Sequence, residues 1–466
     1  MSAGGPRGSR MAFRPGGSGP LLSFYGDDFT GSTDSLEALA TAGVPAMLFL
    51  EPPSPDDLAT RWPNLRAVGV AGTSRSRSPD WMDAHLPQVF AKLRALAPLC
   101  HYKTCSTFDS APEVGNIGRA AEIGQAVFGG KVLVVVGVVR HQRFVVFANL
   151  FAAGSVGDTH EIFRIDRHPT MSKHPVTPMR EADLRLHLAE QAPQRRIAGF
   201  DFRRMLAPDA DAALQAVLAD NDLVILDTFD AATTRATGAL IAAHAARGPA
   251  FLVGSSGVEY ALVDHLTNAG VLPIVAPPTP RGPAEKIVAV CGSCSPITES
   301  QIAWAEANGF FVIAADTVAM VEGGEEIEAR TAEMLADALS KSTGVVLHSA
   351  RGPADPRLGP TRAALEKRGL TALDSSRILG NAMGRVMRCL IAKTGVSRAV
   401  LAGGDSSSHT VDAMGVEALA VAGPLVPGAP LCRIHSTDAA IDGVEMSLKG
   451  GQVGGPDFFG RVLAGR

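Results

Sequence analysis

The sequence predicts an α/β protein with two domains, each a mostly parallel sheet flanked by helices, and a cleft between them. At 466 residues the chain is longer than one hydrophobic core normally supports. Short apolar runs alternate with stretches of helical apolar spacing, which is typical of parallel strands joined by helices. A proline-rich segment at 272–285 interrupts this alternation and excludes regular structure there, so it predicts a linker.

Strands are expected in the first domain, residues 21–271, at 21–25, 46–50, 67–71, 101–103, 132–136, 223–227 and 251–254. The regular pattern weakens between about 140 and 204, where a long ordered excursion containing His168 and His174 is expected. In the second domain, residues 286–466, the expected strands are 286–290, 311–314, 344–348, 398–402 and 443–448, with helices at 298–308 and 377–393. Residues 1–20 are rich in Gly, Pro, Ser and Arg without the apolar centre of a signal peptide, so a disordered tail is expected.

Composition excludes several classes of function. Hydrophobic residues make up 46% of the chain and charged residues 19%, but no apolar run is long enough to span a bilayer. The net charge of −4 provides no basic field for nucleic acid. The six cysteines are sparse, and the single CxxC, Cys291 to Cys294, has no second pair, so reduced thiols in a cytoplasmic protein are expected. The sequence is compatible with a homodimer but does not determine the oligomeric state.

The densest polar cluster follows the first expected strand. Asp27 and Asp28 lie at its carboxyl end, where open α/β sheets bind ligands. Thr30, Ser32 or Thr33 could cap the next helix, whose first N–H groups would then face an anion. The alternative is a plain helix cap beside a solvated turn.

Two further strand ends carry polar groups. The loop 72–78 offers hydroxyls and the guanidiniums of Arg75 and Arg77, which suit a carboxylate, although a solvated polar loop would have the same composition. Lys103 ends the strand 101–103, and Ser106 and Thr107 follow it.

The second domain carries a candidate phosphate cradle. Gly403 and Gly404 separate the strand 398–402 from a hydroxyl-rich helix start, so backbone N–H groups could approach phosphates there. The chain has no Walker A motif and no GxGxxG after a strand, and a structural turn would explain one glycine pair equally well. The loops 292–295 and 449–451 have the same small, donor-rich character, and together the three loops suggest a nucleotide pocket.

These motifs resemble, in order, those of the four-carbon acid sugar kinase family. The resemblance runs from about residue 21 to the C-terminus and rests on seven segments: 25–34, 73–76, 103–107, 174–179, 292–295, 403–406 and 449–451. It implies a sugar-acid-binding domain at 21–271, a nucleotide-binding domain at 286–466, and ATP-dependent phosphorylation of a four- or five-carbon sugar acid or oxo-acid. ATP and Mg²⁺ are the implied cofactors.

The resemblance also implies site residues. On the substrate side they are Asp27, Asp28, Thr30, Gly31, Asp34, Arg75, Lys103, Ser106, Thr107 and His174. On the ATP side they are Ser293, Ser295, Gly403, Gly404, Asp405, Ser406 and Gly451. Asp28 is the first candidate for the catalytic base and Asp27 the second, because alternation along a strand end turns only one of two neighbours into the cleft.

The chain departs from the family pattern in three places. Cys105 and Asp109 stand where members commonly have aspartate and arginine, Asp405 stands where glutamate is usual, and Cys291 where serine is common. The first departure favours a substrate other than a simple tetronate, and the loop is similar to that of a branch acting on 3-oxo-isoapionate; 3-oxo-tetronates are the other expected substrates. Two rival functions remain: a non-catalytic sugar-acid-binding protein, which would not need a phosphate cradle, and an NAD-dependent dehydrogenase, which the missing GxGxxG disfavours.

Overall fold

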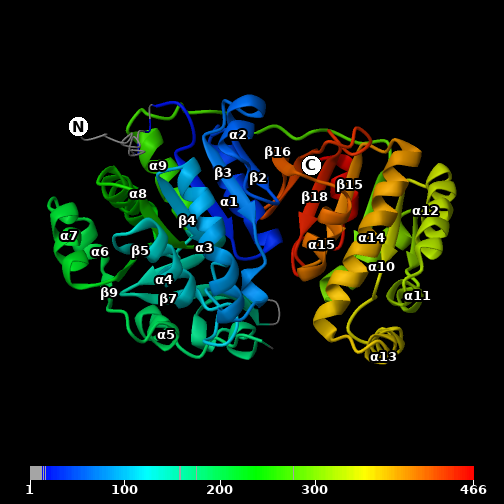
Figure 1. Cartoon of the computed structure of the whole chain (residues 1–466), viewed down its shortest axis with the longest axis horizontal. Coiled ribbons are helices and arrows are strands. Elements are labelled where there is room, and N and C mark those ends of the chain that lie inside the picture. Colours follow the sequence, from blue (N-terminus) through cyan, green and yellow to red (C-terminus); the bar gives the residue numbers. More distant parts are fainter. Residues whose placement is uncertain (1–12, 14, 16, 157–158, 175, 277) are drawn as a thin grey trace, which may run out of the picture.

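The computed structural model describes residues 13, 15, 17–156, 159–174, 176–276 and 278–466. Two α/β halves lie side by side, and the segment between them crosses from one to the other along one edge (Figure 1). Each half contains parallel strands covered by helices, so the predicted fold class is confirmed. Most of the tail expected at 1–20 lies outside the described residues.

The N-terminal half contributes eight parallel strands in the order β2-β3-β1-β4-β11-β5-β10-β9. Their bounds are β1 Leu22–Gly26, β2 Ala46–Phe49, β3 Ala67–Ala71, β4 Leu99–Lys103, β5 Val132–Val135, β9 Ile197–Phe200, β10 Leu223–Leu226 and β11 Ala250–Gly254. In the register of these strands Gly26 lies between Ala71 and Lys103. The ends of β3, β1 and β4 therefore meet at one edge of the sheet.

Helices cover both faces of this sheet, because its strands are apolar on both sides. One face packs on α1 (Phe29–Thr41), α8 (Ala231–Ala246) and α9 (Gly257–Asn268). The other packs on α3 (Pro79–Leu96), α4 (Ile117–Phe128) and α5 (Leu184–Gln191). The other helices of this half are α2 (Pro55–Arg61), α6 (Phe202–Met205) and α7 (Ala210–Asp220), and a 3₁₀ turn η1 (Ser74–Ser76) follows β3.

The excursion expected between 140 and 204 has more regular structure than the sequence indicated. Strands β6 (Arg143–Val146), β7 (Asn149–Val156) and β8 (Thr159–Arg164) form a separate antiparallel sheet, and α5 and the edge strand β9 follow. Val145 of β6 and Leu150 and Ala152 of β7 are buried in the core of the N-terminal half, whereas Glu161 and Ile162 of β8 are exposed. The sequences of these strands lack the strict alternation of apolar and polar residues that predicts a strand.

The C-terminal half has five parallel strands in the order β13-β14-β12-β15-β18, continued by the antiparallel β17 and β16. The bounds are β12 Ile287–Cys291, β13 Phe310–Ala314, β14 Gly344–His348, β15 Arg398–Ala402, β16 Ala418–Val426, β17 Ala429–His435 and β18 Glu445–Lys449. Helices α10 (Pro296–Ala307) and α16 (Phe458–Ala464) pack on one face. The other face packs on α11 (Thr317–Glu322), α12 (Glu325–Ser340), α14 (Ala372–Thr394) and α15 (Asp405–Ala413), and α13 (Leu358–Lys367) lies beside α11 and α14.

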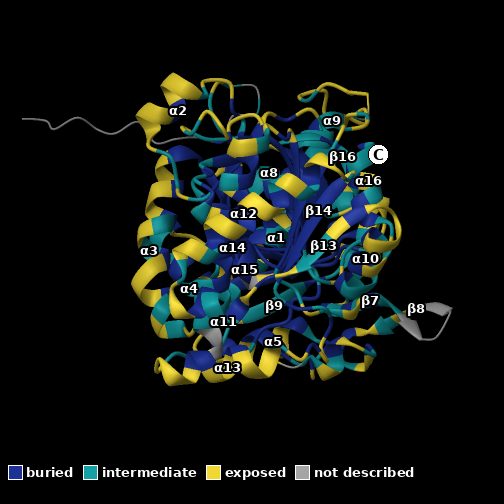
Figure 2. Ribbon diagram, turned by 90° about the vertical axis from the view of Figure 1, so that its right-hand side faces the viewer, coloured by how far each residue is buried: buried dark blue, intermediate teal, exposed yellow. Residues whose placement is uncertain are grey.

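The two sheets join into one sheet of 15 strands, which the sequence did not indicate. β16 pairs antiparallel with β2, with Ala418 opposite Phe49 and Leu419 opposite Leu48. Buried strands therefore run through both halves while exposed surface lies on the helices (Figure 2). Helix α1 also crosses the junction: Glu37 accepts a bond from the Gly428 N–H at 3.0 Å, and Thr33 donates to the Gly428 carbonyl at 3.3 Å.

The strand directions explain how the two site edges meet. Because β16 and β17 alternate in direction, the parallel strands of the two halves run opposite to each other across the junction. A twist of about 20–25° per strand accumulates over the six steps from β15 to β1 to more than a right angle. The carboxyl ends of the two parallel sets are thereby turned toward each other.

Candidate active site

Asp28 is the N-cap of α1. Its Oδ1 accepts a hydrogen bond from the Gly31 N–H at 3.1 Å, and its Oδ2 accepts one from Thr30 Oγ1 at 3.1 Å. Ser32 donates back to the Asp28 carbonyl at 2.6 Å. The cap of this helix is therefore Asp28, and the expectation that Thr30, Ser32 or Thr33 would cap it is wrong, because the helix begins at Phe29, before any of them. Thr30 and Gly31 instead donate to the carboxylate of Asp28.

Asp27 is placed differently from its neighbour. Its side chain is buried, with 4% of the residue exposed, and Oδ1 has no hydrogen-bond partner within the described part of the chain. Burial, reinforced by the carboxylate of Asp28, raises the pKa of Asp27 to about 7, although Arg75 and Lys103 oppose the shift. A carboxyl with a pKa near neutrality can both accept and release a proton at working pH.

Lys103 supplies a buried cation beneath these carboxylates. Burial on its own would lower the pKa of Lys103, but the carboxylates of Asp34, Asp28 and Asp27 outweigh it and raise the pKa above its ordinary value. Asp34 also lies 3.6 Å from Nε2 of His141. The ammonium of Lys103 therefore stays charged and offsets part of the negative charge at this strand edge.

Arg75 is held by a protein carboxylate. Its Nη2 donates to both oxygens of Asp109, at 3.0 and 2.9 Å, and Nη1 lies 4.0 Å from Asp28. Burial would raise the pKa of Asp109, but the charge of Arg75 with hydrogen bonds from Thr107 and Thr177 lowers it below its ordinary value. One edge of the guanidinium expected to grip a substrate is thus already occupied.

His174 connects to the same network from the excursion. Its Nδ1 lies 3.0 Å from the Thr177 N–H and 2.9 Å from Thr177 Oγ1, which donates to Asp109 at 3.0 Å. Ser106 is half-buried in the turn that carries Thr107. His174, Thr107 and Arg75 are therefore brought together around Asp109, a residue that the sequence singled out only as a departure from the family pattern.

The three glycine loops of the C-terminal half pack against one another. The Gly403 N–H donates to the Lys449 carbonyl at 3.0 Å, and Ser295, which caps α10, donates to the Gly451 carbonyl. A Cβ added to Gly451 would lie 2.5 Å from Oγ of Ser293. A Cβ on Gly292 would lie 2.3 Å from Oγ of the buried Ser406. No side chain would fit at Gly292 or at Gly451 without a clash, so only backbone occupies these two positions of the edge.

Gly404 differs from these packed glycines. It is the N-cap of α15, and a Cβ built there would meet nothing within 4 Å. Open space at a helix N-terminus is what a phosphate group requires. The side chain of Asp405, which is expected to face ATP, lies outside the part of the chain that the structure describes.

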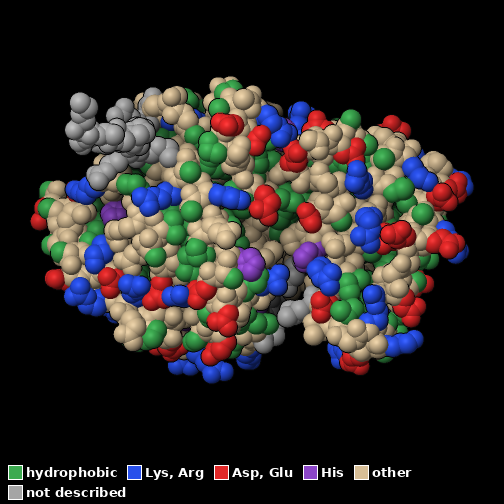
Figure 3. All heavy atoms as spheres, viewed as in Figure 1, with side chains coloured by type: hydrophobic (Ala, Val, Ile, Leu, Met, Phe, Trp, Pro, Cys, Tyr) green, Lys and Arg blue, Asp and Glu red, His purple; other side chains and the backbone are tan. Residues whose placement is uncertain are grey.

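The two edges meet in a pocket of about 40 Å³. It is lined from the N-terminal half by Asp27, Asp28, Phe29, Gly72, Thr73, Arg75, Ser76 and Arg77, and from the C-terminal half by Gly404, Ser408 and His409. Above it, Gly450 lies beside Thr30, with a Cβ on the glycine reaching to 3.8 Å from Oγ1. This volume holds only a few water molecules. The surface is notched between the two halves on the face seen in Figure 3.

A second hollow of about 330 Å³ adjoins this pocket. The two share Phe29, Gly72, Thr73, Arg77, Ser408 and His409, and the larger one extends over Trp81 and His85 to Asp412. The sequence offered Arg77 together with Arg75 as a group suited to a carboxylate, but the family resemblance implied a site role only for Arg75. Ser408 and His409 were not expected to reach the N-terminal half, because only the strand pairing at the junction brings them there.

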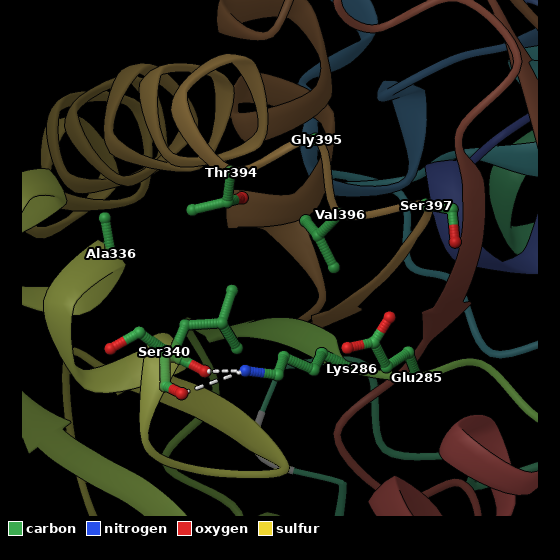
Figure 4. A pocket seen from close by; sticks show the side chains of 9 residues that line it. Glu285, Lys286, Ala336, Ser340, Thr394, Gly395, Val396 and Ser397 are labelled. Atoms are coloured by element: carbon green, nitrogen blue, oxygen red, sulfur yellow. Dashed lines mark hydrogen bonds between the residues drawn. The ribbon is translucent and has the colours of Figure 1, made fainter.

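Another hollow, of about 370 Å³, lies at the opposite edge of the C-terminal sheet (Figure 4). It is formed around the starts of β12 and β15, with Thr394, Gly395, Val396 and Ser397 on one side and Ala336 and Ser340 facing them. The Lys286 ammonium donates to the carbonyls of Leu339 and Ser340, at 2.6 and 3.2 Å. Lys286 is the one cationic side chain that lines this hollow, and its ammonium is already bonded to protein carbonyls. We therefore do not consider the hollow a candidate active site.

No group of three or more His, Cys, Asp or Glu side chains suited to a metal ion occurs among the described residues. All six cysteines are free; Cys291 is buried and Cys294 exposed, so they form no disulfide. Within the described ranges no helix is both long and apolar enough to cross a bilayer.

Comparison with known proteins identifies the family. A model for a sugar-binding N-terminal domain matches residues 22–262, and one for a nucleotide-binding C-terminal domain matches residues 288–459. The protein is thus a two-domain enzyme that brings a sugar derivative and a nucleotide together. The chain belongs to the four-carbon acid sugar kinase family.

Relatives align along nearly the whole chain. A 3-oxo-isoapionate kinase of Paraburkholderia graminis is 46% identical over 96% of this chain and 95% of its own length. A 3-oxo-tetronate kinase of Methylobacterium radiotolerans is 31% identical over 95% of this chain and 98% of its own. Among solved structures, a Salmonella typhimurium protein superposes with a TM-score of 0.69 at 21% identity, covering 94% of this chain and 98% of that one, which shows a shared fold.

Proposed function

We propose that this kinase transfers the γ-phosphoryl group of ATP to a hydroxyl of a five-carbon oxo-sugar acid, with 3-oxo-isoapionate as the preferred substrate and 3-oxo-tetronates as weaker ones. The observation that carries the proposal is the pocket in which the buried carboxylate of Asp27 faces the open helix start at Gly404. Phosphoryl transfer requires little more than this juxtaposition, with cations to neutralise charge. The 46% identity to a 3-oxo-isoapionate kinase supports the choice of substrate.

Asp27 is the proposed general base. The sequence alone favoured Asp28, but both oxygens of Asp28 are engaged in capping α1. Asp27 keeps one oxygen without a partner among the described residues and has a pKa near 7. Asp28 then orients the start of α1 and adds negative charge that keeps the pKa of Asp27 raised.

The remaining roles follow from position. Lys103 and the free edge of Arg75 would balance the charge of the sugar acid, with Thr30, Gly31, Asp34, Ser106, Thr107 and His174 around them. The backbones of Gly403, Gly404 and Gly451 with Ser293, Ser295, Asp405 and Ser406 would surround the ATP phosphates. Mg²⁺ bound to the ATP phosphates would supply further charge neutralisation.

The proposed domains are 21–271 for the sugar acid and 286–466 for the nucleotide, with the linker 272–285 between them. A homodimer and a cytoplasmic location remain parts of the proposal, and light scattering of the purified chain would test the first. The pocket of about 40 Å³ is too small for a sugar acid, whereas the adjoining hollow of about 330 Å³ falls within the range of small-molecule sites.

A coupled assay of ADP release tests the function directly. The panel contains 3-oxo-isoapionate, 3-oxo-tetronates, D-threonate and D-erythronate, with ATP alone as the control for hydrolysis. We expect the highest kcat/KM with the five-carbon oxo-acid, because Cys105 and Asp109 replace groups that a linear tetronate would bind. A clear preference for a linear tetronate would refute the substrate choice. If no acid causes ADP release, the kinase reaction is refuted and a non-catalytic sugar-acid-binding protein is favoured. If NAD but not ATP raises the unfolding temperature, a dehydrogenase is favoured.

A further inference from the structure

Arg77 is fixed at the edge where the two halves face each other. It follows the 3₁₀ turn after β3, where its N–H donates to the Ser74 carbonyl at 3.1 Å and its carbonyl accepts from the Gly115 N–H at 2.9 Å. Both backbone groups are thus held by the protein. The side chain lines both the small pocket and the larger hollow beside it.

The guanidinium of Arg77 has no acceptor in the described part of the chain. Its Nε is buried without a hydrogen-bond partner, and no carboxylate there lies within 4.0 Å of it. Its Cζ lies 5.3 Å from the ring centre of Trp81, a contact that stabilises one face but uses none of the in-plane N–H groups. A buried donor left without an acceptor is costly, so the arrangement indicates a ligand that supplies one.

Arg75 provides an internal comparison two residues away. Its Nη2 is bonded to both oxygens of Asp109, whereas Arg77 has no such partner in the region described. Of the two guanidiniums that line the pocket, Arg75 is paired with a carboxylate and Arg77 is not paired with any described one. The family resemblance implies a substrate role for Arg75, whereas the structure leaves Arg77 as the arginine without a carboxylate partner among the described residues.

The opposite wall of the pocket comes from the C-terminal half. Gly404, at the N-terminus of α15, lines it with Ser408 and His409 from the same helix. A helix N-terminus and a guanidinium both favour negative charge, and oxyanions bind a guanidinium through paired hydrogen bonds. A group placed between the two walls is held by both halves at once.

We propose that Arg77 binds the oxyanion group that lies between the halves in the reacting complex, and so acts as a determinant of phosphoryl transfer or of acid recognition. This rests on the proposed kinase function. Two groups have the required chemistry, the transferring phosphoryl group of ATP and the carboxylate of the sugar acid. The kinetic constants distinguish them, because the first acts mainly in the transition state and the second already in the ground state.

The test compares Arg77→Met, which removes the charge at similar length, with Arg77→Lys, which keeps the charge without the planar fork. Arg203→Met is the matched control, because Arg203 is exposed and its partners, the carboxylate of Asp201 and the ring of Phe147, lie on another part of the N-terminal half. Circular dichroism and thermal unfolding establish that each variant is folded. ADP release is then measured with the acid that the wild type prefers, varying each substrate in turn.

We expect kcat/KM of Arg77→Met to fall by about 100-fold or more, the scale on which removal of one oxyanion donor acts. A fall in kcat with both KM values nearly unchanged assigns the phosphoryl group, and partial recovery in Arg77→Lys supports it. A rise in KM for the sugar acid with kcat retained assigns the carboxylate. Values for Arg77→Met within about twofold of the wild type, as expected for Arg203→Met, would overturn the proposal.

If the wild type releases no ADP with any acid, the kinase function has failed while Arg77 is still tested. Calorimetric titration of the wild type and Arg77→Met with ATP and with D-threonate then decides. Weaker binding of either anion to the variant supports the role of Arg77, and equal affinities for both anions overturn it.

Discussion

Replacing Asp27 by asparagine tests the proposed base through stability as well as through activity. Burial and the charge of Asp28 raise the pKa of Asp27 from 3.8 to about 7 in the folded chain. The folded chain therefore keeps this proton up to about pH 7, whereas the unfolded chain releases it near pH 4. Folding takes up a proton in that window, so this group makes stability fall as the pH rises across it.

The size of the effect follows from the shift. A difference of about three pKa units at about 1.4 kcal/mol each gives roughly 4 kcal/mol at pH 8, as an upper bound for one buried carboxyl. The amide side chain of the Asp27→Asn variant would be neutral at every pH and would avoid this loss. We expect the stability gained by Asp27→Asn over the wild type to grow between pH 4 and pH 7 and to level off above pH 7.

Thermal unfolding of ligand-free protein in Mg²⁺-free buffers, measured from pH 5 to pH 9, checks this expectation. Asp209→Asn is a suitable control, because Asp209 is exposed and makes no side-chain cap bond. Its unfolding temperature should match that of the wild type throughout the series. A difference between Asp27→Asn and wild type that does not change with pH would refute the assignment of a raised pKa to Asp27.

Three further outcomes are expected. Asp27→Asn should lower kcat by about 10²–10⁴-fold, while Asp28→Asn, which can still cap α1, should lose less; the reverse order in steady-state assays would make Asp28 the base. In the wild type, kcat/KM should rise with pH as Asp27 ionises near pH 7, and a flat profile between pH 5 and 9 would count against this base. Gly404→Val should weaken ATP binding, measured by calorimetric titration, because the valine side chain would fill the space that a phosphate needs. Sugar-acid binding should persist, because the open space at Gly404 admits a side chain without a clash. An equal loss of affinity for both ligands would instead indicate that the variant is unfolded.

Local patterns predicted the strands that position the site. The ends of β1, β3 and β4 were placed to within a residue or two because each is a short apolar run closed by polar residues. The pairing of β16 with β2 could not be predicted, since it joins segments more than 350 residues apart in the chain and depends on how whole sheets meet. Ser408 and His409 were missed for that reason.

The choice between neighbouring side chains also lay beyond the sequence. Asp27 and Asp28 are the same residue type in adjacent positions, and only the cap geometry of α1 shows which one keeps an oxygen available. Arg75 and Arg77 present the same problem. Asp109 lies more than 30 residues after Arg75, and folding alone decides which arginine it pairs with.

The pairing of β16 with β2 has a consequence for assembly. The one covalent connection between the two halves is the segment 272–285, whose 14 residues reach about 46–50 Å when extended. The edge of β2 offers the same backbone groups to β16 of any copy of the chain, so two chains can trade C-terminal halves while each pocket keeps all of its contacts. Each pocket would then draw its base from one chain and its helix start from the other. Refolding Asp27→Asn together with Gly404→Val would, by such an exchange, rebuild one intact pocket from two impaired variants.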